Sequence, residues 1–328
     1  MEKYVKIAAS AAYLPPRVVT NDELSQIMPT SDEWIQAHTG IKTRHFALEE
    51  NTSMMGAKVA QQLLEQAQVA ATDIDLIIVA TISPDAITPA TATLIQKAIG
   101  ATKAFAYDIS AACAGFIFAL STADKFLRTA QYHRALVISA ENFSKMLDFQ
   151  DRTSAVFFGD GAAGVLLESS TDPADNMIIA ESLHADGNAE VIHSGRIAPI
   201  TDIAATNYPQ MDAFFQDGRA VYQFVTENIP PHIREFCDHN GLTPDDLDMV
   251  ITHQANLRLI EKIAALLQQP MSKFPHNVDR VGNTSSAGIA LVLNEILQAG
   301  KRPQKLMLTG FGAGLAYGSI LLDLQHYQ

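Results

Sequence analysis

Three side chains suited to acyl chemistry stand out in the sequence, each in a different segment. Cys113 lies in "DISAACAG", His253 in "MVITHQANLRLIEKI" and Asn283 in "DRVGNTSSAGIAL". A cysteine thiolate is a strong nucleophile, and a histidine or an asparagine beside it can donate a hydrogen bond to a reacting oxygen. Each residue also has a plainer interpretation, because most free cysteines are small core residues, and histidine and asparagine are common at strand ends and turns.

The three residues lie at junctions between predicted elements. Cys113 separates the strand "AFAYDI" from the helix "AGFIFALSTADKFL", so its sulfur falls in or just before the first turn of a buried helix. The unpaired N–H groups of a helix N-terminus stabilise a thiolate. His253 follows a buried strand, and Asn283 lies in a glycine-containing turn before another helix. Because α/β folds build active sites at strand ends, we expect the three side chains to converge.

The elements that carry these residues occur twice in the chain. Near-continuous apolar strands alternate with helical patterns in both halves, as in α/β proteins. The pattern predicts an α/β fold of two duplicated halves stacked around buried helices: residues 1–170 with the cysteine, and residues 171–328 with the histidine and asparagine. The polar, turn-rich segment 171–216 is predicted to link or cap the halves. The matching pairs are 71–81 with 243–253, 114–127 with 287–300, 134–141 with 305–312, and 164–169 with 318–324.

Composition excludes several classes of function. The net charge of −13 argues against nucleic acid as a partner. The longest apolar runs are too short to span a membrane, and the N-terminus lacks the apolar core of a signal peptide. Two cysteines, Cys113 and Cys237, cannot build a disulfide framework, which favours the cytoplasm. The ten histidines are scattered without a metal-binding motif, so we expect no metal.

The stretch "GDGAAG" (159–164) fits the glycine pattern of dinucleotide-binding folds. That pattern must open a helix, whereas here it leads into the strand-like "VLLES". We therefore interpret it as a turn between two strands and expect no nicotinamide cofactor.

Seven motifs distributed along the chain carry a resemblance to a known family: "TSDEWI", "TGI", "ACAGF", "DRTSAVFFGDGA", "THQANLRLI", "GNTSSAG" and "FGAGLAYGS". With these motifs the chain as a whole resembles β-ketoacyl-acyl carrier protein synthase III, a thiolase-fold condensing enzyme, from about Ile7 to Leu324. The resemblance implies a thiolase-like αβαβα arrangement and a cytoplasmic homodimer. It also implies an acyltransferase that condenses an acyl-CoA primer, such as acetyl-CoA, with malonyl-acyl carrier protein at the start of type II fatty acid synthesis, with no cofactor.

The resemblance also implies roles for individual residues. Cys113, His253 and Asn283 would be the catalytic triad, and the backbone N–H groups of Cys113 and Ala313 would hold the acyl oxyanion. An asparagine at position 283 suits decarboxylative condensation, because a carboxylate there would repel the enolate. The other implied positions are Trp34, Arg152 and Arg258 for CoA, Asn256 for ordering the site, Thr88 for the acyl pocket, and Arg258, Lys262 and Lys273 for carrier-protein docking.

Three departures from the family pattern bear on binding. His38 stands where relatives often have an arginine, which predicts a weaker or pH-dependent contact with a CoA phosphate. The stretch "AALL" (264–267) replaces a basic pair near the docking patch. Thr88 stands where some relatives that accept only short primers have a phenylalanine, so we expect longer primers to be accepted.

Two other functions remain open from sequence alone. One is a related thiolase-fold acyltransferase, such as an enzyme with a Cys-His-Asp triad or a hydroxymethylglutaryl-CoA synthase with a glutamate base. The other is a non-catalytic subunit of a condensing complex. Asn283 speaks against the Cys-His-Asp enzymes, and the presence of all three catalytic residue types speaks against the non-catalytic subunit.

Overall fold

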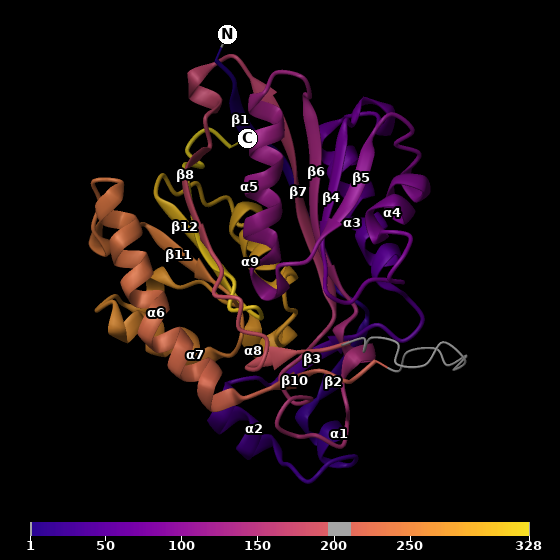
Figure 1. The fold of residues 1–328 in the computed structure, drawn as a ribbon, viewed down its shortest axis with the longest axis vertical. Helices are drawn as coiled ribbons and strands as arrows, with labels where there is room; N and C mark the ends of the chain where they lie inside the picture. The colour runs from indigo at the N-terminus through magenta and orange to yellow at the C-terminus, as the bar shows by residue number, and fades with distance from the viewer. Residues whose placement is uncertain (1, 196–210, 328) are drawn as a thin grey trace.

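The computed structural model describes residues 2–195 and 211–327, and its elements form five layers. Figure 1 shows two sheets with α5 and α9 between them, α3 and α4 outside the first sheet, and α6 and α7 outside the second. This is the predicted αβαβα arrangement. The helices are α1 Asn21–Ser25, α2 Asp32–Thr39, α3 Thr52–Ala67, α4 Thr91–Ile99, α5 Gly115–Arg128, α6 Gly218–His239, α7 Leu257–Leu266, α8 Val278–Val281 and α9 Ala287–Gln298.

The first sheet has the strand order β1-β7-β6-β4-β5, and the second has the order β8-β13-β12-β11. Two short hairpin-like pairs, β2 with β3 and β9 with β10, lie outside these sheets. The strands are β1 Tyr4–Tyr13, β2 Arg17–Thr20, β3 Thr43–Phe46, β4 Leu76–Ala80, β5 Phe105–Ile109, β6 Arg134–Glu141, β7 Gly161–Ser170, β8 Ile178–His184, β9 Ile192–His193, β10 Phe215–Gln216, β11 Met249–Thr252, β12 Leu306–Phe311 and β13 Tyr317–Leu322.

The two sheets repeat the same topology, as the internal sequence matches predict. In both, two antiparallel pairings (β1–β7–β6 and β8–β13–β12) are followed by a parallel pairing (β6–β4 and β12–β11), and the first sheet adds a further parallel strand, β5. The repetition extends to single side chains. The carboxylate of Asp75 accepts hydrogen bonds from the backbone N–H groups of His133 and Arg134. Asp248 does the same for residues 304 and 305 in the second half.

The segment 171–216 differs in part from the prediction of a link or cap. Residues 178–184 form β8, which pairs antiparallel with β13 and completes the second sheet. This strand is only partly buried, so its sequence "IIAESLH" contains polar residues and lacks the continuous apolar pattern of the other strands. The rest of that prediction reaches into 196–210, outside the described residues. The predicted boundary between the two halves, after residue 170, stays a prediction. Side chains of the first half contact the second half across it, because Val19 and Ile35 share a hydrophobic cluster with α6 and α7.

The stretch "GDGAAG" (159–164) leads into a strand, β7, and not into a helix, which confirms that part of the prediction. It is not a turn between two strands, because residues 161–164 already belong to β7 and residues 152–157 before the stretch form turns. Between the sheets, α5 and α9 are buried along most of their length. Glycines allow the close packing at their ends: a Cβ on Gly310 would lie 2.9 Å from the Cα of Ala114. Within residues 2–195 and 211–327, no helix is long and apolar enough to cross a bilayer.

Candidate active site

Cys113 lies in the short 3-10 turn Ala112–Ala114 that leads into α5. Ala112 has a φ of 47°, a conformation that L-residues rarely adopt, and it redirects the chain just before the thiol. The Sγ atom lies 3.4 Å from the hydroxyl of Ser285. The thiol pKa is raised to about 12, mainly by burial and in smaller part by the charge of Glu141, while the hydrogen bond with Ser285 acts in the opposite direction. Burial therefore outweighs the expected stabilisation of the thiolate by the helix N-terminus.

His253 follows β11 and is 3 % exposed. Its backbone N–H donates to the carbonyl of Thr309 at 2.8 Å, and its ring packs edge-on to Phe311 with centroids 5.1 Å apart. Burial lowers the imidazole pKa to about 3, so the ring is neutral near pH 7. Nδ1 has no hydrogen-bond partner within the described part of the chain. A neutral imidazole offers one donor and one acceptor, as a histidine in contact with substrate requires.

Asn283 is 6 % exposed and is held at several points. Its backbone N–H donates to Phe157 at 2.8 Å, and its carbonyl accepts from the N–H of Gly159 at 3.0 Å. The side-chain Oδ1 accepts from the N–H of Ser285 at 2.8 Å. Gly282 supports this turn with a φ of 71°, and a Cβ there would meet Phe157. Because Oδ1 accepts the bond from Ser285, Nδ2 is the amide atom that remains to donate a hydrogen bond to another group.

Contacts through Ser285 bring Asn283 and Cys113 together. The N–H of Ser285 binds the Asn283 amide, and its hydroxyl lies against the thiol. Sequence reasoning missed Ser285, although it lies in the quoted stretch "GNTSSAG".

The end of β12 joins Cys113 to His253. A Cβ on Gly312 would lie 2.7 Å from the backbone nitrogen of Cys113. The preceding residue, Phe311, contacts the His253 ring. The next residue, Ala313, is partly buried and makes no hydrogen bond through its N–H in the part of the chain that the structure describes. The backbone N–H groups of Cys113 and Ala313, which the resemblance implies for an oxyanion, therefore belong to two segments that pack together at Gly312.

Trp34 and Arg152 form a second group near α2. The Arg152 guanidinium lies 5.0 Å from the Trp34 ring centroid and donates to the carbonyl of Pro29. His38 stacks on Trp34 with centroids 4.3 Å apart. In this arrangement no ring fits between Trp34 and Arg152, so binding of an adenine between them requires the guanidinium to move.

The remaining predicted residues lie on or near α7 or on a distant loop. Arg258 donates to the carbonyls of residues 36 and 37 and pairs with Glu261, which ties α7 to the end of α2. Asn256 caps α7 through the N–H of residue 259, an ordinary helix cap. Lys262 is exposed, and Lys273 donates to the carbonyl of residue 245. Thr88 is exposed between β4 and α4, and within the described residues it makes no hydrogen bond to the three central side chains.

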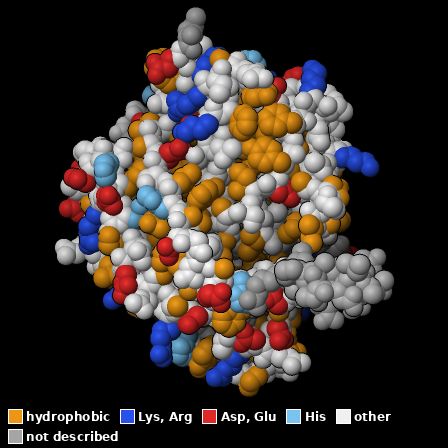
Figure 2. All heavy atoms as spheres, in the orientation of Figure 1, with side chains coloured by type: hydrophobic (Ala, Val, Ile, Leu, Met, Phe, Trp, Pro, Cys, Tyr) orange, Lys and Arg blue, Asp and Glu red, His pale blue; other side chains and the backbone are white. Residues whose placement is uncertain are grey.

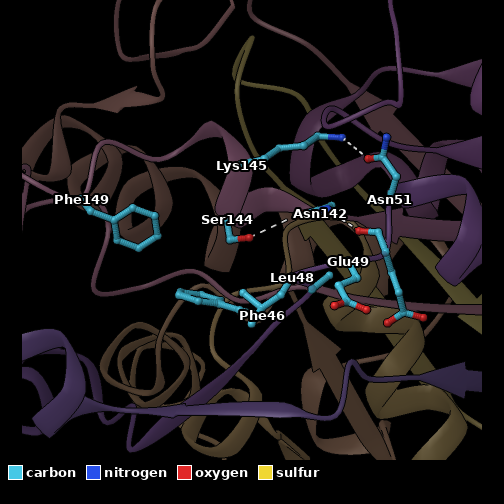
Figure 3. A pocket seen from close by; sticks show the side chains of 10 residues that line it. Phe46, Leu48, Glu49, Asn51, Asn142, Ser144, Lys145 and Phe149 are labelled. Atoms are coloured by element: carbon cyan, nitrogen blue, oxygen red, sulfur yellow. Dashed lines mark hydrogen bonds between the residues drawn. The ribbon is translucent and has the colours of Figure 1, made fainter.

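Two cavities lie away from these residues. One of about 370 Å³ opens between the loop after β3 and the loop after β6, where Phe46, Leu48, Lys145 and Phe149 line it (Figure 3). The other, of about 390 Å³, lies between β8 and α6. Cys113, His253 and Asn283 line neither. The chemistry of the side chains, rather than cavity size, therefore identifies the candidate active site.

Comparison with known proteins gives one family. Residues 107–187 match the model of 3-oxoacyl-[acyl-carrier-protein (ACP)] synthase III, and residues 237–324 match the model of its C-terminal part. The chain is 61 % identical to a β-ketoacyl-[acyl-carrier-protein] synthase III of Lactiplantibacillus plantarum, over 98 % of this chain and 99 % of that protein. It is 44 % identical to the synthase III of Streptococcus suis, over 99 % of this chain and all of that one.

Solved structures agree with this result. The crystal structure of 3-oxoacyl-[acyl-carrier-protein] synthase III from Aquifex aeolicus superposes with a TM-score of 0.89 at 36 % identity, over 97 % of this chain and 99 % of that one. The Pseudomonas aeruginosa structure gives 0.90 at 30 % identity, over 99 % of both chains. The predicted thiolase-like fold is thus confirmed. The chain belongs to the 3-oxoacyl-[acyl-carrier-protein] synthase III family.

Proposed function

We propose that the chain condenses an acyl-CoA primer with malonyl-acyl carrier protein, releases CO₂ and CoA, and forms a 3-oxoacyl-acyl carrier protein. Family membership confirms the predicted enzyme class, an acyltransferase of fatty acid synthesis. The assignment of this reaction to particular residues of the chain rests on the geometry around Cys113.

In the first step, the Cys113 sulfur attacks the thioester carbon of the primer, and the CoA sulfur leaves. The thiol is protonated in the free protein, so its proton must be removed as the attack proceeds. Neutral His253 has an acceptor nitrogen for this proton, which CoA takes as it departs. The backbone N–H groups of Cys113 and Ala313 stabilise the tetrahedral oxyanion.

In the second step, malonyl-acyl carrier protein loses CO₂, and an enolate forms on its thioester. Two neutral donors, a His253 N–H and the Nδ2 of Asn283, stabilise the enolate oxygen without delivering a proton to the carbanion. The carbanion attacks the acyl carbon on Cys113, and the sulfur leaves as thiolate, which takes a proton from water to restore the thiol.

One observation carries the proposal: the N–H of Ser285 occupies the Oδ1 of Asn283, so the amide presents a donor to the site. An aspartate at this position would present an acceptor, as in the alternative Cys-His-Asp acyltransferases. A non-catalytic subunit would have no need for a buried donor beside a buried thiol.

Trp34 and Arg152 are proposed to bind the adenine of CoA after the guanidinium moves, with Arg258 near its phosphates. Arg258, Lys262 and Lys273 are proposed to meet the acidic carrier protein. Of the two lysines, Lys262 is exposed, and Lys273 is engaged with a carbonyl. We propose no cofactor, and the described residues hold no cluster of three potential metal ligands.

A homodimer is proposed through β5, the last strand of the first sheet. An edge strand presents free N–H and C=O groups to a second copy. Phe105 on this strand is 36 % exposed and packs with Tyr107, Phe126 and Tyr132 in an aromatic cluster. Hydrophobic side chains gather over this part of the surface in Figure 2. Thr88 would then belong to the acyl pocket of the second copy. The compartment is proposed to be the cytoplasm.

Intact-mass measurement after incubation with acetyl-CoA tests the first step. We expect a single acetyl adduct that is lost in Cys113→Ala and kept in the matched control Cys237→Ala. An adduct that persists in Cys113→Ala would overturn the proposed nucleophile.

A further inference from the structure

Glu141, the last residue of β6, is a fully buried carboxyl group that the proposed reaction does not use. Five hydrogen-bond contacts surround it. Oε1 accepts from the hydroxyl of Ser286 at 2.7 Å, and Oε2 accepts from the hydroxyl of Ser83 at 2.6 Å. Oε2 also meets the hydroxyl of Thr81 and the N–H groups of Ile82 and Ser83 at 3.1–3.2 Å. Burial raises the pKa of the Glu141 carboxyl above its ordinary value, and these hydrogen bonds act against that shift by stabilising the ionised form.

This carboxylate joins three segments that are distant in sequence. Thr81 to Ser83 form the loop after β4, Glu141 ends β6, and Ser286 begins α9. Ser286 is the counterpart of Cys113 in the second half of the repeat. Cys113 directly precedes the Ala-Gly pair at the start of α5, and Ser286 directly precedes the Ala-Gly pair at the start of α9. Where the first half has the nucleophile, the second half has a hydroxyl that binds Glu141.

The bond to Ser286 holds one end of the turn that carries Asn283. The other end is held by the backbone pairing of Asn283 with residues 157 and 159. Between these two anchors lies Ser285, which has a φ of 50° and contacts both the Asn283 amide and the Cys113 thiol. The direction of the Asn283 Nδ2 therefore depends on the position of Ser286.

Holding this turn has an electrostatic cost. The charge of Glu141 disfavours the Cys113 thiolate and raises the thiol pKa. Burial lowers the pKa of Lys145, and the charge of Glu141 acts against that shift. The Lys145 ammonium group nevertheless donates its hydrogen bonds to Asn51 and to the carbonyl of Pro84, and not to Glu141. A charge so placed does not assist the nucleophile, which points to a geometric role.

We propose that Glu141 is a positioning residue for the condensation step: through Ser286 it fixes the turn 283–286 and aims the Asn283 amide at the enolate oxygen. The inference rests on the proposed function, since it assigns Asn283 to that step. It separates Glu141 from the residues that touch substrate.

Three variants and a control test this inference. Glu141→Ala removes the whole network. Glu141→Gln keeps the shape of the side chain and can keep the network. The amide oxygen can accept from the loop 81–83, and the amide nitrogen can donate to Ser286. The Ser286 hydroxyl can then donate to the carbonyl of residue 80, which lies 3.1 Å from it. Ser286→Ala removes the hydroxyl that contacts Glu141 and the carbonyl of residue 80, and leaves the other donors to Glu141 in place. The matched control is Ser139→Ala, also buried in β6, whose hydroxyl has no partner in the described part of the chain.

Each protein is assayed for single-turnover acylation by acetyl-CoA, for CO₂ release from malonyl-acyl carrier protein, and for the pH profile of thiol alkylation. We expect Glu141→Ala to acylate within a few-fold of the unaltered protein and to lose about 10- to 100-fold in condensation, below the full loss of a donor. Ser286→Ala loses less, while Glu141→Gln and Ser139→Ala stay near the unaltered rate. Alkylation of Glu141→Gln moves to lower pH, because a charge near the thiol is gone.

The results distinguish the failure of the inference from that of the proposed function. If the unaltered protein releases no CO₂, the proposed function fails. If it does, and Glu141→Ala condenses normally, the positioning role is wrong. Loss of acylation and condensation in equal proportion, or a Glu141→Gln defect as large as that of Glu141→Ala, would also overturn the inference. If Glu141→Ala does not fold, Ser286→Ala decides: normal condensation in that variant refutes the role.

Discussion

Replacing Asn283 separates the two steps of the proposed reaction. Asn283→Ala removes one donor to the enolate oxygen and the acceptor of the Ser285 N–H, but it keeps the backbone N–H groups of Cys113 and Ala313. Loss of one such donor typically costs about 10²–10³ in rate, or roughly 3–4 kcal/mol. Acylation of Cys113 should stay close to normal, because Asn283 takes no part in it.

Asn283→Asp should be worse than Asn283→Ala. One carboxylate oxygen would keep the bond from the Ser285 N–H, and the other would replace Nδ2 and face the enolate. Two like charges about 4 Å apart at an effective dielectric constant of ~20 repel by about 4 kcal/mol. This adds roughly a factor of 10³ to the loss in condensation. Protonation of the introduced carboxyl would restore a donor, so the residual activity should rise as the pH falls.

The assay pairs single-turnover acylation, followed by mass spectrometry, with CO₂ release from labelled malonyl-acyl carrier protein. Asn240→Ala, at the exposed end of α6, is the matched control. His253→Ala should lose condensation similarly, with a further modest loss of acylation because the imidazole also receives the thiol proton. If a folded Asn283→Ala lost both activities in proportion, Asn283 would be a structural turn residue and the division of labour would be refuted.

Three further predictions concern binding and stability. Trp34→Ala should raise the KM for acetyl-CoA by about 5- to 100-fold with little change in kcat, because the loss of one stacked base has an effect in this range. An unchanged KM would exclude the proposed adenine site at Trp34. Thr88→Phe should narrow the range of primers relative to the unaltered protein, which we expect to accept four- to five-carbon acyl-CoA, and identical primer profiles would contradict the acyl-pocket assignment. Burial lowers the pKa of His232 to about 4, whereas an ordinary histidine has a pKa of about 6.5. Between pH 6.5 and pH 4, roughly, the unfolded chain therefore binds more protons at this residue than the folded chain does. The melting temperature should therefore fall as the pH drops through this window, and less steeply in His232→Gln; equal slopes would contradict this.

Local patterns in the sequence were sufficient to predict much of this molecule. The apolar strands and the Ala-Gly helix starts led to the repeated halves, and junctions between elements marked Cys113, His253 and Asn283. Long-range contacts were not predictable in this way. Glu141 binds partners 60 and 145 positions away, and Arg258 reaches a carbonyl 222 positions away. The thiol pKa was also misjudged, because a helix N-terminus can be read from sequence, whereas the depth of burial cannot.

Ala112 and Ser285 have nearly the same positive φ, 47° and 50°, and each precedes one of the two central helices. One backbone geometry thus occurs twice, beside a nucleophile in one half and beside a structural hydroxyl in the other. In an ancestral unit that paired with its own copy, both positions would have been equivalent and equally open to substitution. In a chain that contains both copies, the two positions can differ, so that one half carries the nucleophile and the other a hydroxyl that supports the turn. Substitutions at the two equivalent positions should accordingly have different effects on activity, although the two positions share one backbone geometry.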